Sequence, residues 1–277
     1  MKLLIINNPY SGKNDPKKIE YLKNKLSNYY EITKFDSYQL GSITNYIVNE
    51  MSEDYDVIVI CGGDGTVNEA IKALVKRNIN PKIAIVPFGT LNDFAHYLKM
   101  SKNIEKTVEY IKKSKTIKHN IYSANDSFFI YGFAIGMLSN ISYARLRHKR
   151  LFGRLSYYFV ALKEIFKSKK TNIILTVNDK QIKLKCNLVL AYSTNRIAGY
   201  NVKKNEKLTI VVLKGLKLFF PFKLFFYFIT GCAKYKFFAD EFKIESNSIE
   251  FNTDGERNSY NNAIKISKGK EFEFITK

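Results

Sequence analysis

Apolar and polar positions follow two different rhythms along this chain. As far as about Lys115, short apolar runs predict strands, and segments with apolar residues three or four positions apart predict helices. The expected strands are residues 2–7, 30–35, 56–60 and 82–86, and the expected helices are residues 15–27, 43–51, 66–76 and 92–99. Each apolar strand ends in Gly, Asn or Pro before a helix begins. This order predicts a parallel α/β domain that binds ligands at the carboxyl ends of its strands.

Beyond Lys115 several segments alternate residue by residue, which is typical of half-exposed antiparallel strands. The expected strands are residues 128–134, 172–177, 182–191, 207–213, 242–245, 249–252, 263–267 and 272–276. Helices are expected near residues 137–148, 155–166 and 217–230. We place a boundary near Ile121. The prediction is an α/β N-terminal domain with a parallel sheet over residues 1–121 and a mainly antiparallel, β-rich domain over residues 122–277, whose last strand could return to the first domain.

The composition supports folded domains and a preference for anionic partners. Of the 277 residues, 45% are hydrophobic, which is enough apolar surface for real cores. The net charge is +20, from 45 basic and 25 acidic residues, and such a field favours nucleotides, nucleic acid or acidic membranes. An A+T-rich coding sequence would produce the same lysine-rich composition, so both interpretations stay open. Aromatic and basic residues do not interleave in any nucleic-acid-binding string, and no nucleic-acid partner is expected.

The cysteines and the apolar runs indicate a cytoplasmic protein. Cys61, Cys186 and Cys232 lie far apart, which argues against a disulfide framework or a zinc site and fits a reducing compartment. Residues 1–8 lack the long apolar core of a signal peptide. The most apolar stretch, residues 216–232, is interrupted by Lys217, Pro221 and Lys223 and falls short of a spanning helix.

A glycine-rich string, CGGDGTVNE at residues 61–69, follows the strongest expected strand and opens a helix. Glycines at Gly62, Gly63 and Gly65 let backbone N–H groups approach phosphate oxygens, and the helix N-terminus adds positive potential. The carboxylate of Asp64 cannot bind phosphate directly, so we expect it to act through a metal ion or a bridging water. A simple strand-to-helix turn capped by Asp64 is the alternative. The length of the full string favours the phosphate site.

Three further segments carry candidate chemistry. In residues 87–95, PFGTLNDFA, Thr90 or Asn92 could cap a helix with Asp93 in its first turn, and this loop would line one crevice with the glycine-rich string. Residues 8–13, NPYSGK, follow the first strand but lack the spacing of a P-loop; Lys13 either contacts phosphate or is solvated. The string Asp-Gly-Glu at residues 254–256 is typical of a β-turn with exposed carboxylates.

Together these segments resemble the diacylglycerol kinase catalytic-domain family, in its bacterial lipid-kinase branch. The family strings NPxSGK, GGDGTxNE and PxGTxNDFA match residues 8–13, 62–69 and 87–95. Its Thr-x-x-x-Gly, Gly-x-x-x-Tyr and late Asp-Gly-Glu segments look matched by residues 37–41, 153–157 and 254–256. The resemblance covers essentially the whole chain. NAD kinases share the GGDGT loop but lack the NDFA string at this position.

The resemblance implies a lipid kinase that uses ATP and Mg²⁺ in a cleft between the two domains, with diacylglycerol as the favoured acceptor. Asp64 would organise Mg²⁺ on the phosphates, and Asp93 would support the acceptor side. Glu256 would be the general base on the lipid hydroxyl, with Asp254 beside it. The expected ATP contacts are Asn8, Ser11, Lys13, Ser37, Gly62, Gly63, Asp64, Gly65, Thr66, Val67, Asn68, Glu69, Gly89 and Thr90. A kinase for a sphingoid or soluble acceptor, and a nucleotide-binding regulator without activity, stay open, as does a homodimer.

One segment departs from the family pattern. Bacterial members bind a structural Mg²⁺ in a loop that ends in Asp-Gly-x-Leu, whereas this chain has Asn205 and Glu206 at the Asp and Gly positions. Lysines, including Lys207, crowd this loop. We therefore expect a weak or absent structural cation site near Val202, Asn205 and Lys207.

The string LKLFFPFKLFFYFI at residues 216–229 is unusually apolar, with six Phe and two Lys. It is too interrupted to span a bilayer but apolar enough to lie at the headgroup boundary, where Lys217 and Lys223 could extend to the lipid phosphates. We therefore expect peripheral contact with an anionic membrane. The alternative is a helix that packs most of these rings on the sheet of the second domain.

Overall fold

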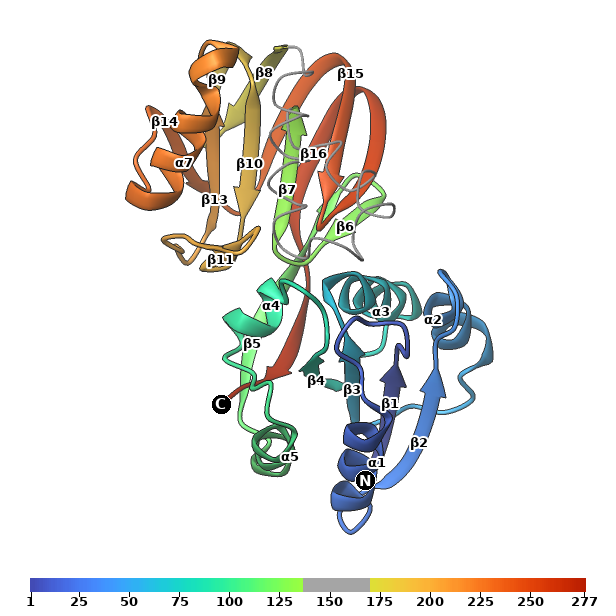
Figure 1. The fold of residues 1–277 in the computed structure, drawn as a ribbon. Helices are drawn as coiled ribbons and strands as arrows, with labels where there is room; N and C mark the ends of the chain where they lie inside the picture. The colour runs from blue at the N-terminus through green and yellow to red at the C-terminus, as the bar shows by residue number, and fades with distance from the viewer. Residues whose placement is uncertain (137–169) are drawn as a thin grey trace. The chain divides into compact units, whose positions relative to one another are not determined.

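The computed structural model describes residues 1–136 and 170–277 (Figure 1). The chain divides into two compact units. Unit 1 comprises Met1–Asn120 and Lys270–Lys277, and unit 2 comprises Ile121–Gly269. The helices expected near residues 137–148 and 155–166, and the motif at residues 153–157, lie outside the described residues.

Unit 1 is built on a parallel sheet with strand order β2-β1-β3-β4-β16. These strands are β1 (Lys2–Asn7), β2 (Glu31–Asp36), β3 (Val57–Gly62), β4 (Lys82–Pro87) and the end of β16 (Glu256–Ile275). Every residue of β3 is buried, as expected for a strand covered on both faces. The predicted parallel sheet of the first domain is confirmed, and its four expected strands lie within one or two residues of their predicted bounds.

The helices of unit 1 follow the strands, with three differences from the prediction. They are α1 (Pro16–Leu26), α2 (Ser42–Asn45), the π-helix η1 (Tyr46–Glu50), α3 (Asp64–Arg77), α4 (Asp93–Tyr97) and α5 (Ile104–Lys113). The expected helix at residues 43–51 is one α-helical turn continued by η1. The helix expected at residues 92–99 is shorter, because Asn92 is left-handed with φ 52° and Lys99 with φ 58°. Helix α5 was not predicted, although it buries Val108 and Ile111 at helical spacing.

Unit 2 is antiparallel, as predicted. Its sheet has the order β14-β13-β10-β7-β15-β16, β8 also pairs with β15, and β9 pairs with β8. Strand β5 (Thr116–Ala124) begins in unit 1 and ends in unit 2. The other strands are β6 (Ser127–Phe129), β7 (Gly132–Gly136), β8 (Thr171–Val177), β9 (Lys180–Cys186), β10 (Leu188–Tyr192), β11 (Arg196–Ile197), β12 (Tyr200–Asn201), β13 (Leu208–Leu213), β14 (Tyr235–Ala239) and β15 (Phe242–Thr253). The helical segment expected at residues 217–230 is the 3₁₀-helix η2 (Lys217–Phe219) followed by α7 (Phe220–Thr230).

Several strand bounds in unit 2 differ from the prediction. The strand expected at residues 128–134 is divided between β6 and β7, and that at residues 182–191 between β9 and β10. Conversely, the segments at residues 242–245 and 249–252 form one strand, β15, with an irregularity between Ser246 and Ile249. The segments at residues 263–267 and 272–276 likewise lie in one long strand, β16, whose last residues belong to unit 1. Strand β5 was not predicted.

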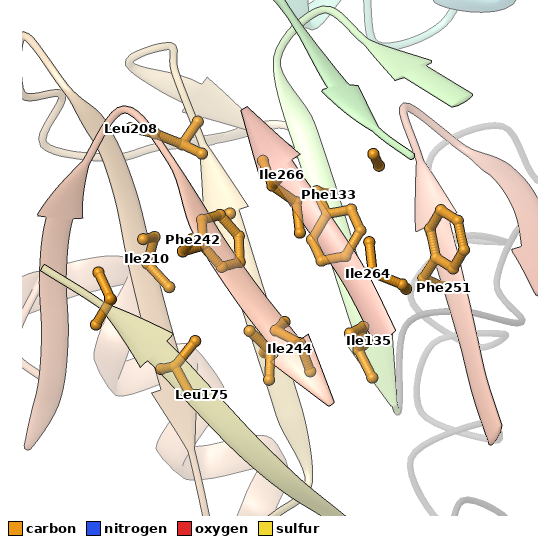
Figure 2. Packing of buried hydrophobic residues seen from close by; sticks show 14 of the residues in the cluster. Phe133, Ile135, Leu175, Leu208, Ile210, Phe242, Ile244, Phe251, Ile264 and Ile266 are labelled. Carbon is orange, nitrogen blue, oxygen red and sulfur yellow. The ribbon is translucent and has the colours of Figure 1, made fainter. Parts of the chain in front are cut away.

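The core of unit 2 lies on one face of its sheet (Figure 2). Phe133 and Ile135 of β7, and Phe242, Ile244 and Phe251 of β15, point into it together with residues of β8, β13 and β16. Each fully buried side chain of this size contributes about 1.5–3 kcal/mol to folding. Neighbouring residues on the strands, such as Ala134 and Leu190, point to the other face, where α7 covers them. The alternation seen in the sequence therefore becomes two apolar layers.

Candidate active site

Three loops of unit 1 meet at the carboxyl ends of its parallel strands. The amide of Asn8, after β1, donates to the carbonyl of Cys61 at 3.0 Å. The amide of Phe88, after β4, donates to the carbonyl of Gly62 at 2.9 Å, and the amide of Lys13 donates to the carbonyl of Phe88 at 2.9 Å. The structure thus brings together the three unit 1 segments that the sequence singled out, and they form one rim.

The two glycine loops touch through their backbones at Gly63 and Gly89. A Cβ atom added to Gly89 would lie 2.5 Å from the Cα of Gly63 and 2.6 Å from Oδ1 of Asn92. Real Cβ atoms essentially never come so close, so Gly89 excludes larger residues. A Cβ atom on Gly63 would lie 3.0 Å from the Cα of Gly89, which is a tight contact. The Asn92 side chain closes the second loop, because Oδ1 accepts from the Gly89 amide and Nδ2 donates to the Gly89 carbonyl, both at 2.8 Å. Asn92 therefore shapes its loop and does not cap α4 with its side chain.

The N-terminus of α3 opens onto this rim. Helix α3 begins at Asp64, and its N-cap residue, Gly63, has no side chain that could cap the first turn. Gly65 is exposed, and a Cβ there would meet open space. The first N–H groups of a helix have no partners within the helix, and they attract anions together with the helix dipole. This end of α3 therefore has the form of a phosphate site.

Two carboxylates stand beside that helix end. Asp64 is half-buried, and its Oδ1 accepts from the amide of Phe94 at 3.4 Å, which brings the start of α4 close to the start of α3. Asp93, the first residue of α4, is buried. Asp64 is the more accessible of the two and is the carboxylate that could reach a metal ion on a bound phosphate.

The side chains of four predicted nucleotide contacts are buried or hydrogen-bonded within unit 1. Thr66 is buried, and its Oγ1 accepts from Nδ2 of Asn8 at 3.0 Å. Val67 and Asn68 are also buried. The carboxylate of Glu69 accepts from the amides of Ile43 and Thr44 at 3.1 and 3.2 Å, and it stabilises the start of α2. Ser11, Lys13, Gly89 and Thr90 are half-buried or exposed on the rim.

A polar network at the end of β1 was not predicted. Asn7 is buried, its Nδ2 donates to Asp36 at 2.7 Å, and its Oδ1 accepts from Asn14 at 2.6 Å. Burial opposes the ionisation of Asp36, but hydrogen bonds from Lys34 and Asn7 hold its pKa below the usual value. Its anionic form therefore orients Asn7. The sequence offered one signal for this network, namely the polar residue Asn7 at the end of an otherwise apolar strand.

The next loop, after β2, is joined to this network at Ser37. Its amide donates to the Asn7 carbonyl at 2.7 Å, and its hydroxyl lies 2.7 Å from that of Ser42. Ser37 is itself buried. The segment at residues 37–41 thus lies beside the β1 loop, and the ATP contact at Ser37 stays a prediction.

In unit 2, Asp254 and Gly255 form the turn of the β15–β16 hairpin. Thr253 pairs with Glu256, and φ is 50° at Asp254 and 97° at Gly255, which is the two-residue turn for which Asp-Gly is preferred. The interpretation of this turn as one with exposed carboxylates is wrong for Asp254, which is 7% exposed. It holds for Glu256, which is exposed.

Backbone amides surround the buried carboxylate of Asp254. Its Oδ1 accepts from the amides of Tyr131 and Gly132 at 3.1 and 2.8 Å, and its Oδ2 accepts from that of Ile130. Ile130 and Tyr131 lie between β6 and β7, and Gly132 begins β7, so this turn interrupts the strand predicted over residues 128–134. Several N–H donors compensate a buried negative charge. Asp254 therefore ties this loop to the hairpin that carries Glu256.

The predicted residues of the degenerate cation loop lie on the surface of unit 2. Asn205 and Lys207 are exposed, Val202 is half-buried, and Oδ1 of Asn205 accepts from the Lys207 amide at 3.2 Å. Within the described residues, no three His, Cys, Asp or Glu side chains are grouped so that they could hold a metal ion. Within the same residues, no helix has the length and apolar character needed to cross a bilayer.

Comparison with known proteins agrees with this geometry. Residues 2–124 match the model of the diacylglycerol kinase catalytic domain. A Streptococcus pneumoniae protein named "Putative lipid kinase" is 31% identical over 227 residues, which cover 79% of this chain and 76% of that protein. A diacylglycerol kinase of Staphylococcus haemolyticus is 31% identical over 205 residues, which cover 71% of this chain and 60% of that protein.

The fold is also shared with a solved structure. A crystal structure of a diacylglycerol kinase from Bacillus anthracis matches 100% of this chain and 97% of its own, with a TM-score of 0.79 at 24% identity. Similarity at this level shows the two-part fold, and the sequence relatives show the family. The chain therefore belongs to the diacylglycerol kinase catalytic-domain family.

Proposed function

We propose that this protein is an ATP-dependent lipid kinase that transfers the γ-phosphate of ATP to a lipid hydroxyl, with diacylglycerol as the acceptor. The observation that carries the proposal is the backbone contact between Gly63 and Gly89 beside the open N-terminus of α3. Membership of the family supports a kinase that acts on a lipid. The nucleotide and the particular lipid are our proposal.

The phosphates of ATP would bind to backbone N–H groups of the loop at Gly63 and Gly65, with Lys13 adding positive charge from the neighbouring loop. The residues present fit a Mg²⁺ ion bound with ATP, since this ion is commonly held by one or two carboxylates together with phosphates and waters. Asp64 would provide that carboxylate, and the ion would supply charge neutralisation on the phosphates. The protein itself aligns the reactants and limits the access of water.

The acceptor reaction needs a group that takes the hydroxyl proton. In the proposed step the lipid oxygen bonds to the γ-phosphorus, the bond from that phosphorus to the bridging oxygen of ADP breaks, and the proton passes to Glu256. Asp254 fixes the hairpin on which Glu256 lies and is a positioning residue, since its two oxygens already accept backbone N–H groups. Asp93 would support the acceptor side from the first turn of α4.

The test measures the transfer of label from ATP carrying ³²P in its γ-phosphate to diacylglycerol or to sphingosine. A reaction without lipid is the blank. We expect labelled phosphatidic acid, and we expect Asp64→Ala to abolish transfer while circular dichroism shows an intact fold. Asp54→Ala is a matched control, because Asp54 is an exposed unit 1 carboxylate outside the rim. Its activity should equal that of the unsubstituted protein.

Other outcomes would replace parts of the proposal. Label in sphingosine alone would change the acceptor and keep the kinase. ATP binding without transfer to any acceptor would indicate a nucleotide-binding regulator. Near-normal turnover of Asp64→Ala would remove the proposed role of the glycine loop.

A further inference from the structure

The segment formed by η2 and α7 exposes a concentrated apolar surface. Among the described residues, fourteen large hydrophobic side chains are exposed, and seven of them belong to residues 216–229. We call these seven the apolar face of α7; each is 54–73% exposed, and they are Leu216, Leu218, Phe219, Phe222, Phe225, Phe226 and Ile229. The sequence also allowed a helix that packs most of its Phe rings against the sheet of the second domain. That alternative is wrong, because four of the six Phe side chains are exposed.

The helix is nevertheless firmly attached to unit 2 by its other side. Phe220, Leu224 and Tyr227, spaced four and three residues apart, are buried on the sheet layer that contains Leu190 and Leu213. The hydroxyl of Tyr227 lies 2.7 Å from that of Tyr192. Phe228 stacks on Tyr200 of the β11–β12 hairpin, with ring centroids 4.6 Å apart. The helix therefore presents the apolar face from a rigid support, beside β13 and β14 (Figure 1).

Positive charge borders the apolar face. Residues 207–239 contain six lysines and no Asp or Glu. Lys214, Lys223 and Lys234 are exposed. Nζ of Lys223 donates to the Lys214 carbonyl at 2.7 Å, and Nζ of Lys214 lies 5.1 Å from the centre of the Tyr235 ring. Lys223 follows Phe222 directly in α7, and no acidic side chain lies in this part of the sequence to neutralise these lysines.

The size and charge of this surface fit the interface of a bilayer. Helix α7 has 11 residues, so it is about 16 Å long and far shorter than a spanning helix. A short helix whose exposed side is apolar and bordered by lysines is suited to lie in the plane of the headgroups, with its rings among the acyl chains. Anionic headgroups complement the lysines. A protein partner would have to provide both a matching apolar surface and acidic groups.

We propose that η2 and α7 dock this chain on anionic phospholipid bilayers through the apolar face of α7, with Lys214 and Lys223 contacting the headgroups. The inference rests on the proposed function in that a lipid acceptor has to be reached at a bilayer. Its test measures binding without catalysis, so the two proposals can fail separately.

The experiment is co-sedimentation of the full chain with vesicles of phosphatidylcholine alone, or of phosphatidylcholine and phosphatidylglycerol in equal parts. We expect binding to the anionic vesicles at low salt, weaker binding as salt is raised, and little binding to phosphatidylcholine. The double variant Phe222→Ser, Phe226→Ser should bind about tenfold or more weakly, since two rings no longer leave water. Lys214→Gln with Lys223→Gln should reduce the preference for anionic lipid.

A matched control keeps the result specific. Tyr29→Ser with Val48→Ser removes two exposed apolar side chains from unit 1, and it should bind vesicles as the unsubstituted protein does. The Phe222→Ser, Phe226→Ser variant should keep its kinase activity on a short-chain diacylglycerol dissolved without vesicles. Vesicle binding by a protein without any kinase activity would keep the docking surface and overturn only the proposed function.

Two results would overturn the docking proposal. One is a failure of the unsubstituted protein to bind anionic vesicles at low salt. The other is equal binding by the Phe222→Ser, Phe226→Ser variant. If that variant instead dissociates a dimer in sedimentation velocity while vesicles stay unbound, the apolar face is an interface between copies of this chain.

Discussion

At the scale of single residues, Asp254 and Glu256 show how neighbours in one motif acquire different roles. Asp254 is buried under the amides of Ile130, Tyr131 and Gly132, whereas Glu256 is exposed at the start of β16. A carboxylate whose oxygens already accept several backbone N–H groups is poorly suited to take a proton. We therefore keep Glu256 as the proton acceptor of the proposed reaction and take Asp254 as the residue that supports its hairpin.

The Glu256→Gln substitution tests this assignment. A general base contributes roughly 10²–10⁴-fold, so the turnover number should fall by that order while the dissociation constant for ATP stays nearly unchanged. Steady-state kinetics and equilibrium dialysis with ATP measure the two quantities. Glu241→Gln, an exposed carboxylate of the same unit, is the control and should leave both unchanged. A loss confined to ATP binding would show that the role of Glu256 is misassigned.

At the scale of elements, the loops between strands are built by contacts among segments distant in the sequence. Gly63 and Gly89 come from different strand-to-helix connections and touch through their backbones. Glu69 of α3 stabilises the first turn of α2 through the amides of Ile43 and Thr44. The β15–β16 hairpin holds the β6–β7 loop through Asp254 in the same way. Each of these contacts, one by close packing and two by hydrogen bonds, positions a loop through residues that lie outside it.

The hairpin contact can be measured as stability. Asp254→Ala leaves the amides of Ile130, Tyr131 and Gly132 without their acceptor, and we expect the free energy of unfolding in urea to fall by about 3 kcal/mol. Asp179→Ala is a matched control, since Asp179 has φ 61° and is exposed in the turn between β8 and β9. Both substitutions place Ala in the left-handed region, so their difference isolates the carboxylate. Equal losses in the two variants would mean that the three hydrogen bonds add little.

At the scale of the whole molecule, the end of the chain completes the unit that its beginning forms. Phe274 of β16 pairs with Ile83 of β4 and is fully buried. Its ring packs edge-on against Phe94 of α4, with centroids 4.9 Å apart. Thr276 donates to the carbonyl of Leu98 at 2.7 Å. Because the Phe94 amide also contacts Asp64, the last residues support the helix that borders the proposed phosphate site.

The Phe274→Ala substitution should therefore affect both the stability of unit 1 and the site. Removing a fully buried Phe typically destabilises a protein by about 3–5 kcal/mol. We expect a loss of this size in urea unfolding, together with weaker ATP binding in the fraction that stays folded. Phe225→Ala truncates an exposed ring and should change stability little. If Phe274→Ala unfolds at the same urea concentration as Phe225→Ala, the return of the chain to unit 1 contributes no stability.

The sequence by itself determined the elements and loops whose signals are local. The parallel strands β1 to β4 were found because each is a short apolar run, and the glycine loops were found because their strings are long and lie between strand and helix patterns. Tertiary structure alone decided the features that depend on distant partners. Asp254 became buried because amides of another segment reach it. Gly63 and Gly89 came into contact because their two loops follow neighbouring strands of the sheet. The Phe rings of α7 are exposed because the sheet covers only one side of that helix, and no pattern within the helix shows which side an outer layer will leave open.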